Sequence, residues 1–154
     1  MLILLDIDGV MVPAKGWTTP ELLNDGFPDF SARAARVLQS LLSEDTTVVL
    51  TTSHKSNYTI EEWKDIFRKR GINVEKIKSL DFNAESLSRK DEILNWFKAN
   101  SINENFAIID DDKSLNSLPD SLKKHLILTS PYIGLTEEHL ESARAILTKG
   151  LRVA

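Results

Sequence analysis

Short apolar runs alternate along this chain with longer segments that have helical periodicity, and this alternation restricts the possible folds more than any other feature. Strands that alternate with helices form parallel sheets, because each crossover returns the chain to the same end of the sheet. The pattern therefore predicts an α/β fold, in which a doubly wound, mostly parallel sheet carries helices on both faces. The five predicted strands are Leu2–Leu5, Thr47–Leu50, Val74–Ile77, Phe106–Ile109 and Leu126–Leu128.

Capping and stop signals delimit the predicted helices. Thr59 and Glu62 have the spacing of a capping box, and Gly71 supplies the stop of the same helix. Residues 12–28 fit neither periodicity and are rich in proline and glycine, so we expect an ordered loop directly after the first strand. Apolar faces at helical spacing predict further helices over Ser31–Leu42, from Ser88 to about Asn100, and from Thr136 onward.

Chain length and composition limit the number of domains and indicate the cellular compartment. A chain of 154 residues can bury one substantial core but not two comfortable ones, so we expect a single domain over residues 1–154. It has no cysteine, and its N-terminal apolar run lacks the features of a signal peptide, which together predict a cytoplasmic protein. No apolar stretch approaches the roughly 20 residues of a membrane-spanning helix, so no membrane association is expected.

The charge distribution argues against indiscriminate binding to nucleic acid. The net charge is −4, whereas such binding depends on basic residues that neutralise phosphates. One basic cluster shares a predicted helix with acidic residues, which is typical of a solvated helix face. It contains Lys64, Arg68, Lys69 and Arg70.

Two aspartates follow the first predicted strand. Asp6 and Asp8 are spaced i, i+2, so their side chains begin on the same side where the chain leaves the sheet. The two carboxylates would repel each other unless a cation lay nearby, and oxygen ligands suit Mg²⁺. Gly9 allows the backbone to turn tightly and to approach a ligand. Taken alone, the motif is also compatible with a simple Asp-Gly turn after an ordinary strand.

Other polar residues follow neighbouring strands. The carboxyl ends of parallel strands meet at one edge of the sheet, so these residues are expected to form one site with Asp6 and Asp8. A lysine in the first turn of a helix is unfavourable for the helix dipole and calls for an anionic partner. The residues concerned are Thr51, Thr52 and Ser53 after the second strand, Lys90 before the fourth, and Asp110 and Asp111 after it.

The ordered set resembles the motifs of the haloacid dehalogenase superfamily. The Asp-x-Asp-Gly motif of that superfamily matches Asp6 to Gly9, and the resemblance spans nearly the whole chain. The segment Leu128–Thr148 and the end of the fourth strand are similar to the version of this domain found in multidomain RNA-repair proteins. The remaining motifs match Thr51, with Thr52 as an alternative register, Lys90, and Asp110 with Asp111.

The resemblance implies a Mg²⁺-dependent phosphohydrolase that cleaves phosphomonoesters. Asp6 would be the nucleophile that forms an aspartyl-phosphate, and Asp8 would be the general acid and base. Mg²⁺ would be held by the Asp6 carboxylate, the Asp8 backbone carbonyl and Asp111, with support from Asp110. The phosphate oxygens would be bound by Lys90, the Thr51 hydroxyl and backbone N–H groups near Thr52 and Ser53.

Chain length bears on the substrate. The stretches where the superfamily inserts cap domains are short here, which implies an open site without a cap domain. Such a site tolerates a large substrate such as a nucleic-acid end or a phosphoprotein, or a second copy of the chain supplies a lid. The expected partner is a phosphorylated substrate, either a small molecule or a nucleic-acid end. Trp17, Phe27 and Trp63 are candidate stacking surfaces for a base, although Trp63 fits a core position better. His54 and Lys55 are either substrate contacts or polar loop residues.

Two alternatives use the same residues. A phosphotransferase or mutase needs closure that excludes water from the intermediate, and no cap is evident. A non-catalytic phosphate-binding module of the same fold is expected to have lost the nucleophile, a metal ligand or the lysine, and each of these is present. Hydrolysis is therefore the predicted reaction.

Overall fold

Five parallel strands form the predicted sheet in the computed structural model, which describes residues 1–15 and 19–148. The strand order is β3-β2-β1-β4-β5, so β1 occupies the centre. Residues that follow β1 consequently lie at the middle of the carboxyl edge of the sheet. The strands are β1 (Leu2–Leu5), β2 (Thr47–Leu50), β3 (Lys76–Ser79), β4 (Phe106–Asp110) and β5 (Leu126–Leu128).

The third strand corrects the sequence prediction by two residues. The predicted strand covers Val74–Ile77, whereas β3 begins at Lys76, which pairs with Thr47 of β2. Only Ile77 of β3 is buried, because β3 is an edge strand covered on one side. The central strand β1 is apolar and buried throughout, as expected for a strand covered on both faces.

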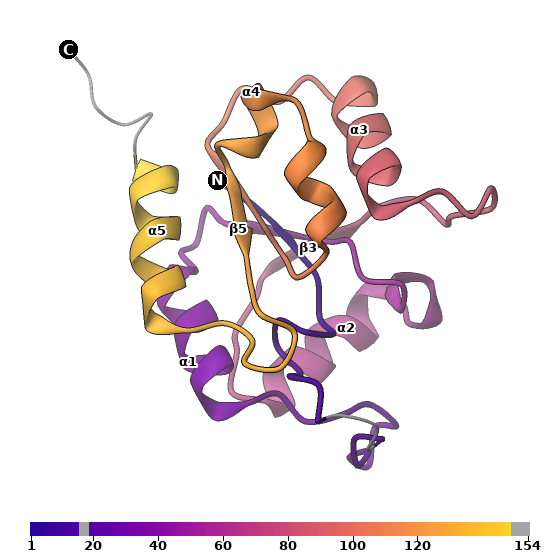
Figure 1. Cartoon of the computed structure of the whole chain (residues 1–154). Helices are drawn as coiled ribbons and strands as arrows, with labels where there is room; N and C mark the ends of the chain where they lie inside the picture. Colours follow the sequence, from indigo (N-terminus) through magenta and orange to yellow (C-terminus); the bar gives the residue numbers. More distant parts are fainter. Residues whose placement is uncertain (16–18, 149–154) are drawn as a thin grey trace.

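Helices cover both faces of the sheet, which confirms the doubly wound architecture. One face packs against α1 (Ala32–Leu41), α2 (Ile60–Lys69) and α5 (Glu137–Thr148), and α1 lies beside α5 (Figure 1). The other face packs against α3 (Arg89–Ala99), the 3₁₀ helix η2 (Lys113–Ser117) and α4 (Asp120–Lys123). A further 3₁₀ helix, η1 (Lys55–Asn57), follows β2. In the described residues no separate cap is present, and no helix is both long and apolar enough to cross a bilayer.

Side-chain caps set where the helices begin. Ser31 caps α1, and Thr59 with Glu62 forms the predicted capping box of α2. The Ser88 hydroxyl accepts a backbone hydrogen bond of 3.1 Å at the start of α3. The cap at Ser88 makes Arg89 the first residue of α3, which determines the direction of its side chain.

The loop between β1 and α1 is held against α2 by Arg70. The Arg70 guanidinium donates to both carboxylate oxygens of Asp25, at 2.7 and 3.0 Å, and to the carbonyls of Phe27 and Pro28. Hydrogen bonds from Arg70 lower the pKa of Asp25. The prediction of a solvated basic face is therefore wrong for Arg70, which is buried, although Arg68 is exposed. Phe27 is also buried, which excludes it as a stacking surface.

Candidate active site

The two aspartates that follow β1 lie in different environments. Asp6 is 4% exposed, and its backbone N–H donates to the Ile109 carbonyl of β4 at 3.0 Å. The Asp8 side chain is 59% exposed. One carboxylate is thus enclosed by the sheet edge, whereas the other faces solvent.

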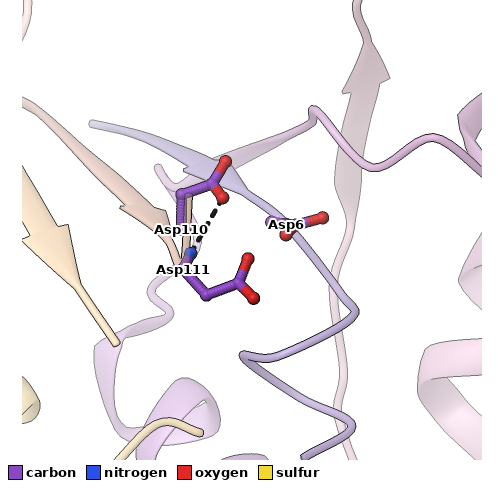
Figure 2. Close-up of side chains that lie close together, drawn as sticks. All are labelled: Asp6, Asp110 and Asp111. Carbon is purple, nitrogen blue, oxygen red and sulfur yellow. Dashed lines mark hydrogen bonds between the residues drawn. The ribbon is translucent and has the colours of Figure 1, made fainter. Parts of the chain in front are cut away.

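Asp6 meets two carboxylates from β4. Oxygen atoms of Asp6, Asp110 and Asp111 all lie within 4.8 Å of one another, and Figure 2 shows the three side chains gathered where β1 and β4 end. Asp110 is completely buried, and its Oδ1 accepts from the backbone N–H groups of Asp111 and Asp112 at 2.8 and 3.0 Å. These bonds turn the chain after β4, so that Asp111 extends into the site.

Gly9 leaves the space that Asp111 occupies. Its φ is +79°, and a β-carbon at this position would overlap Oδ2 of Asp111. The glycine of the Asp-x-Asp-Gly motif is therefore required for the carboxylate cluster as well as for the turn.

The carboxylates are poorly neutralised by the protein alone. Burial first, and then the charge of Asp110, raises the pKa of Asp6 to about 8. Burial also raises the pKa of Asp111. Such a cluster is stabilised by a hard cation, and its all-oxygen donor set fits Mg²⁺.

One arginine reaches this cluster. Nη1 of Arg89 lies 2.7 Å from Oδ2 of Asp110 and 3.3 Å from Oδ1 of Asp6. The sequence predicts Lys90 as the cation of the site, but Arg89 takes this position in the structure. Adjacent residues of a helix point about 100° apart, so the cap that makes Arg89 the first helical residue aims only one of them at the sheet edge. Within residues 1–15 and 19–148, the Lys90 side chain makes no hydrogen bond or ion pair.

Thr51 presents an unpaired hydroxyl at the same edge. Its backbone N–H donates to the Leu5 carbonyl at 3.0 Å, which continues the β1–β2 pairing and places Thr51 beside Asp6. Its Oγ1 is buried and has no hydrogen-bond partner among the described residues. Thr52 Oγ1, in contrast, accepts from the His54 backbone N–H at 3.3 Å. Of the two threonines, Thr51 thus has the hydroxyl free to bind a ligand.

The loop after β2 contributes two further basic residues. His54 Nε2 lies 2.9 Å from Oδ2 of Asp8, while the neighbouring Ser53 is exposed. Lys55 is buried, and its Nζ donates to Glu92 of α3 at 2.8 Å. Their position directly after the second strand was the only sequence signal for these contacts.

Two tryptophans are candidate stacking surfaces for a base, and the structure describes one of them. Trp63 is fully buried, and its Nε1 donates to the Lys55 carbonyl at 3.1 Å, which confirms the core position. Trp17 lies outside the described residues.

Comparison with known families assigns the chain. Residues 2–140 match the family described as the HAD domain in Swiss Army Knife RNA repair proteins, where HAD stands for haloacid dehalogenase. No curated protein and no solved structure matched the chain. The match covers most of the 154 residues and agrees with the parallel sheet and the motif order. The chain therefore belongs to this family of HAD-type hydrolase domains.

Proposed function

We propose that the protein is a Mg²⁺-dependent phosphatase that hydrolyses phosphomonoesters through an aspartyl-phosphate on Asp6. The observation that carries this proposal is that the buried Asp6 carboxylate lies 3.3 Å from Nη1 of Arg89 and within 4.8 Å of a carboxylate oxygen of Asp111. Asp6 is thus close to a positive group and belongs to a carboxylate cluster that can hold a cation. Both are needed before a carboxylate can approach a negatively charged phosphate.

In the first half of the reaction, an Asp6 carboxylate oxygen attacks phosphorus. The bond between phosphorus and the leaving oxygen breaks, and Asp8 gives its proton to that oxygen, so that an alcohol leaves. Arg89 and the Thr51 hydroxyl bind the phosphoryl oxygens. Removing one such stabilising donor typically costs about 10²–10³-fold in kcat.

In the second half, water attacks phosphorus and gives a proton to Asp8. The bond between phosphorus and the Asp6 oxygen breaks, which releases inorganic phosphate and restores both aspartates. The same group serves as acid and then as base. The exposure of Asp8 supports hydrolysis over transfer to another acceptor, because water reaches this side chain directly.

The carboxylates of Asp6 and Asp111 would hold Mg²⁺, together with the backbone carbonyl of Asp8. Asp110, which is occupied by two backbone N–H groups and Arg89, supports this arrangement from beside it. When bound, Mg²⁺ would offset the negative charge of nucleophile and phosphate.

We further propose that the phosphorylated substrate is a nucleotide or an RNA end. The description of the family in terms of RNA repair supports this class of substrate. The open site supports it as well, because the described residues contain no cap that would exclude a chain end. The net charge of −4 argues against tight binding along a nucleic-acid strand.

A phosphate-release assay tests the proposal. The panel contains an aryl phosphate, nucleotides, phosphosugars, and oligoribonucleotides with a 3′- or 5′-phosphate, each with Mg²⁺ or EDTA. Wild type is expected to release phosphate only with Mg²⁺, and Asp6→Asn is expected to release none. Release that persists in EDTA or in Asp6→Asn would overturn the mechanism, and preference for a phosphosugar would overturn the substrate class.

A further inference from the structure

The exposed Asp8 has a specific partner in His54. Nε2 of His54 lies 2.9 Å from Oδ2 of Asp8, although the two residues are 46 positions apart in the chain. The His54 side chain is 37% exposed and that of Asp8 is 59% exposed. The contact therefore lies at the solvent-exposed part of the site.

Contacts with Phe27 and Thr52 hold His54 in position. The ring of Phe27 packs edge-on against the imidazole, with centroids 5.5 Å apart and an interplanar angle of 88°. Phe27 is 2% exposed, and its carbonyl accepts from Arg70 at 2.9 Å. The backbone N–H of His54 donates to Thr52 Oγ1. His54 is thus held by the loop after β1 on one side and by the end of β2 on the other.

We propose that His54 is a positioning residue that holds the Asp8 carboxylate in its proton-transferring orientation. This inference rests on the proposed function, because it concerns the general acid and base of that reaction. An exposed aspartate otherwise samples several rotamers, and only some bring its oxygen to the leaving group. Among the hydrogen bonds of the described residues, the contact with His54 is the one that involves the Asp8 side chain.

The first half of the reaction shows how the leaving group of the substrate can reveal the role of this contact. In the first half, Asp8 must place its proton on the leaving oxygen as the bond from phosphorus to that oxygen breaks. A nitrophenolate is a weak base and can leave without this proton. An alkoxide is a strong base and has to be protonated as it leaves. Loss of a group that positions Asp8 should therefore lower kcat/KM much more for alkyl phosphates than for activated aryl phosphates. A residue that only stabilises the fold or binds phosphate affects both substrates alike.

The test compares His54→Leu with His54→Gln. Leucine keeps the packing against Phe27 but cannot hydrogen-bond, whereas a glutamine amide carries both a donor and an acceptor. For an alkyl phosphate such as a 3′-phosphorylated nucleotide, His54→Leu is expected to lower kcat/KM by about 10- to 100-fold, part of the roughly 10²–10⁴-fold effect of general acid catalysis. For 2,4-dinitrophenyl phosphate, the decrease should stay below about 3-fold. Glutamine should restore most of the loss.

A double-mutant cycle with Asp8→Asn shows whether His54 acts through Asp8. In the Asp8→Asn background, His54→Leu should have little further effect on kcat/KM for the alkyl phosphate. Equal losses for both substrates, full additivity in the cycle, or wild-type kinetics of His54→Leu would each overturn the inference and leave the phosphatase proposal standing.

A measurement without turnover separates the two proposals. Scalar couplings of the Asp8 β-protons report its χ1 rotamers by NMR in the protein without substrate. A single dominant rotamer in wild type and in His54→Gln, with averaging in His54→Leu, supports the inference. The same averaging in all three proteins overturns it. If wild type releases no phosphate from any substrate, the proposed function fails, and the couplings then show only whether His54 restricts the Asp8 side chain.

Discussion

Gly9 and Asp111 lie in contact, with no room for a side chain between them: a β-carbon at residue 9 would overlap Oδ2 of Asp111. Gly9→Ala should therefore displace this carboxylate and weaken Mg²⁺ binding by about 10- to 100-fold, the range observed when residues that orient metal ligands are changed. Calorimetric titration with Mg²⁺ measures the effect.

Gly26→Ala is the matched control for this substitution. Gly26 has the same φ of +79°, but a β-carbon there would meet nothing within 4 Å. Both variants carry the same backbone strain, so only the overlap with Asp111 differs. Equal Mg²⁺ affinities of the two variants would show that Gly9 does not make room for a metal ligand.

Thr51 should matter for activity but not for stability. Thr51→Val replaces an unpaired, buried hydroxyl by a methyl group of the same shape, so the free energy of unfolding should not fall by more than about 0.5 kcal/mol. The value of kcat/KM should fall by about 10²-fold, because a phosphate-binding donor is lost. Thr52→Val is the control for the stability measurement only: its Oγ1 accepts a hydrogen bond from the His54 backbone N–H, so the substitution should cost about 1 kcal/mol of stability. Thr51→Val with full activity would remove Thr51 from the site.

Arg89 and Lys90 are expected to differ sharply. Arg89 contacts Asp6 and Asp110, so Arg89→Gln should lower kcat/KM by about 10²-fold or more. Lys90→Gln should change kcat/KM by less than about 3-fold, because Lys90 lies on a different side of the helix. Steady-state kinetics on one substrate distinguishes the two. A larger loss in Lys90→Gln would return the phosphate-binding role to the lysine that the sequence predicts.

The raised pKa of Asp6 predicts how stability depends on pH without metal. Between pH 4 and pH 8, folded Asp6 keeps a proton that the unfolded chain has lost, because its pKa is raised from 3.8 to about 8. The free energy of unfolding should therefore decrease as pH rises through this window, and less steeply in Asp6→Asn. Mg²⁺ binds the ionised form, so its stabilising effect should grow with pH. Urea unfolding at several pH values, with and without Mg²⁺, measures both effects. If the free energy of unfolding depended on pH in the same way in wild type and in Asp6→Asn, this would contradict the raised pKa of Asp6.

Much of the fold could be predicted because its signals are local. Residues 2–5 and 47–50 are apolar runs that coincide with β1 and β2, and the cap of α2 depends on Thr59 and Glu62, which lie three residues apart. Asp110 and Asp111 could be anticipated because they directly follow an apolar strand. The predicted position of the edge strand β3 differs from the observed one because only one face of β3 is buried, so its apolar signal rests largely on Ile77.

The remaining features depend on contacts between distant segments. The sequence predicts a helix from Ser88, but whether Arg89 or Lys90 reaches Asp6 and Asp110 depends on how α3 packs against the sheet. The burial of Arg70 depends on Asp25, 45 residues away, and no local pattern indicates it. The contact between His54 and Asp8 joins two loops, and their meeting follows from the sheet order rather than from either loop.

The phosphorylated residue itself is the most direct test of the central claim. Wild type is mixed with substrate and Mg²⁺, quenched in acid and reduced with borohydride, which converts an aspartyl-phosphate to homoserine. Peptide mass spectrometry then locates the modified residue. We predict homoserine at position 6 in a peptide that contains intact Asp8, and none when substrate is omitted. Phosphate release with no modification at Asp6, or with homoserine at another aspartate, would contradict the mechanism.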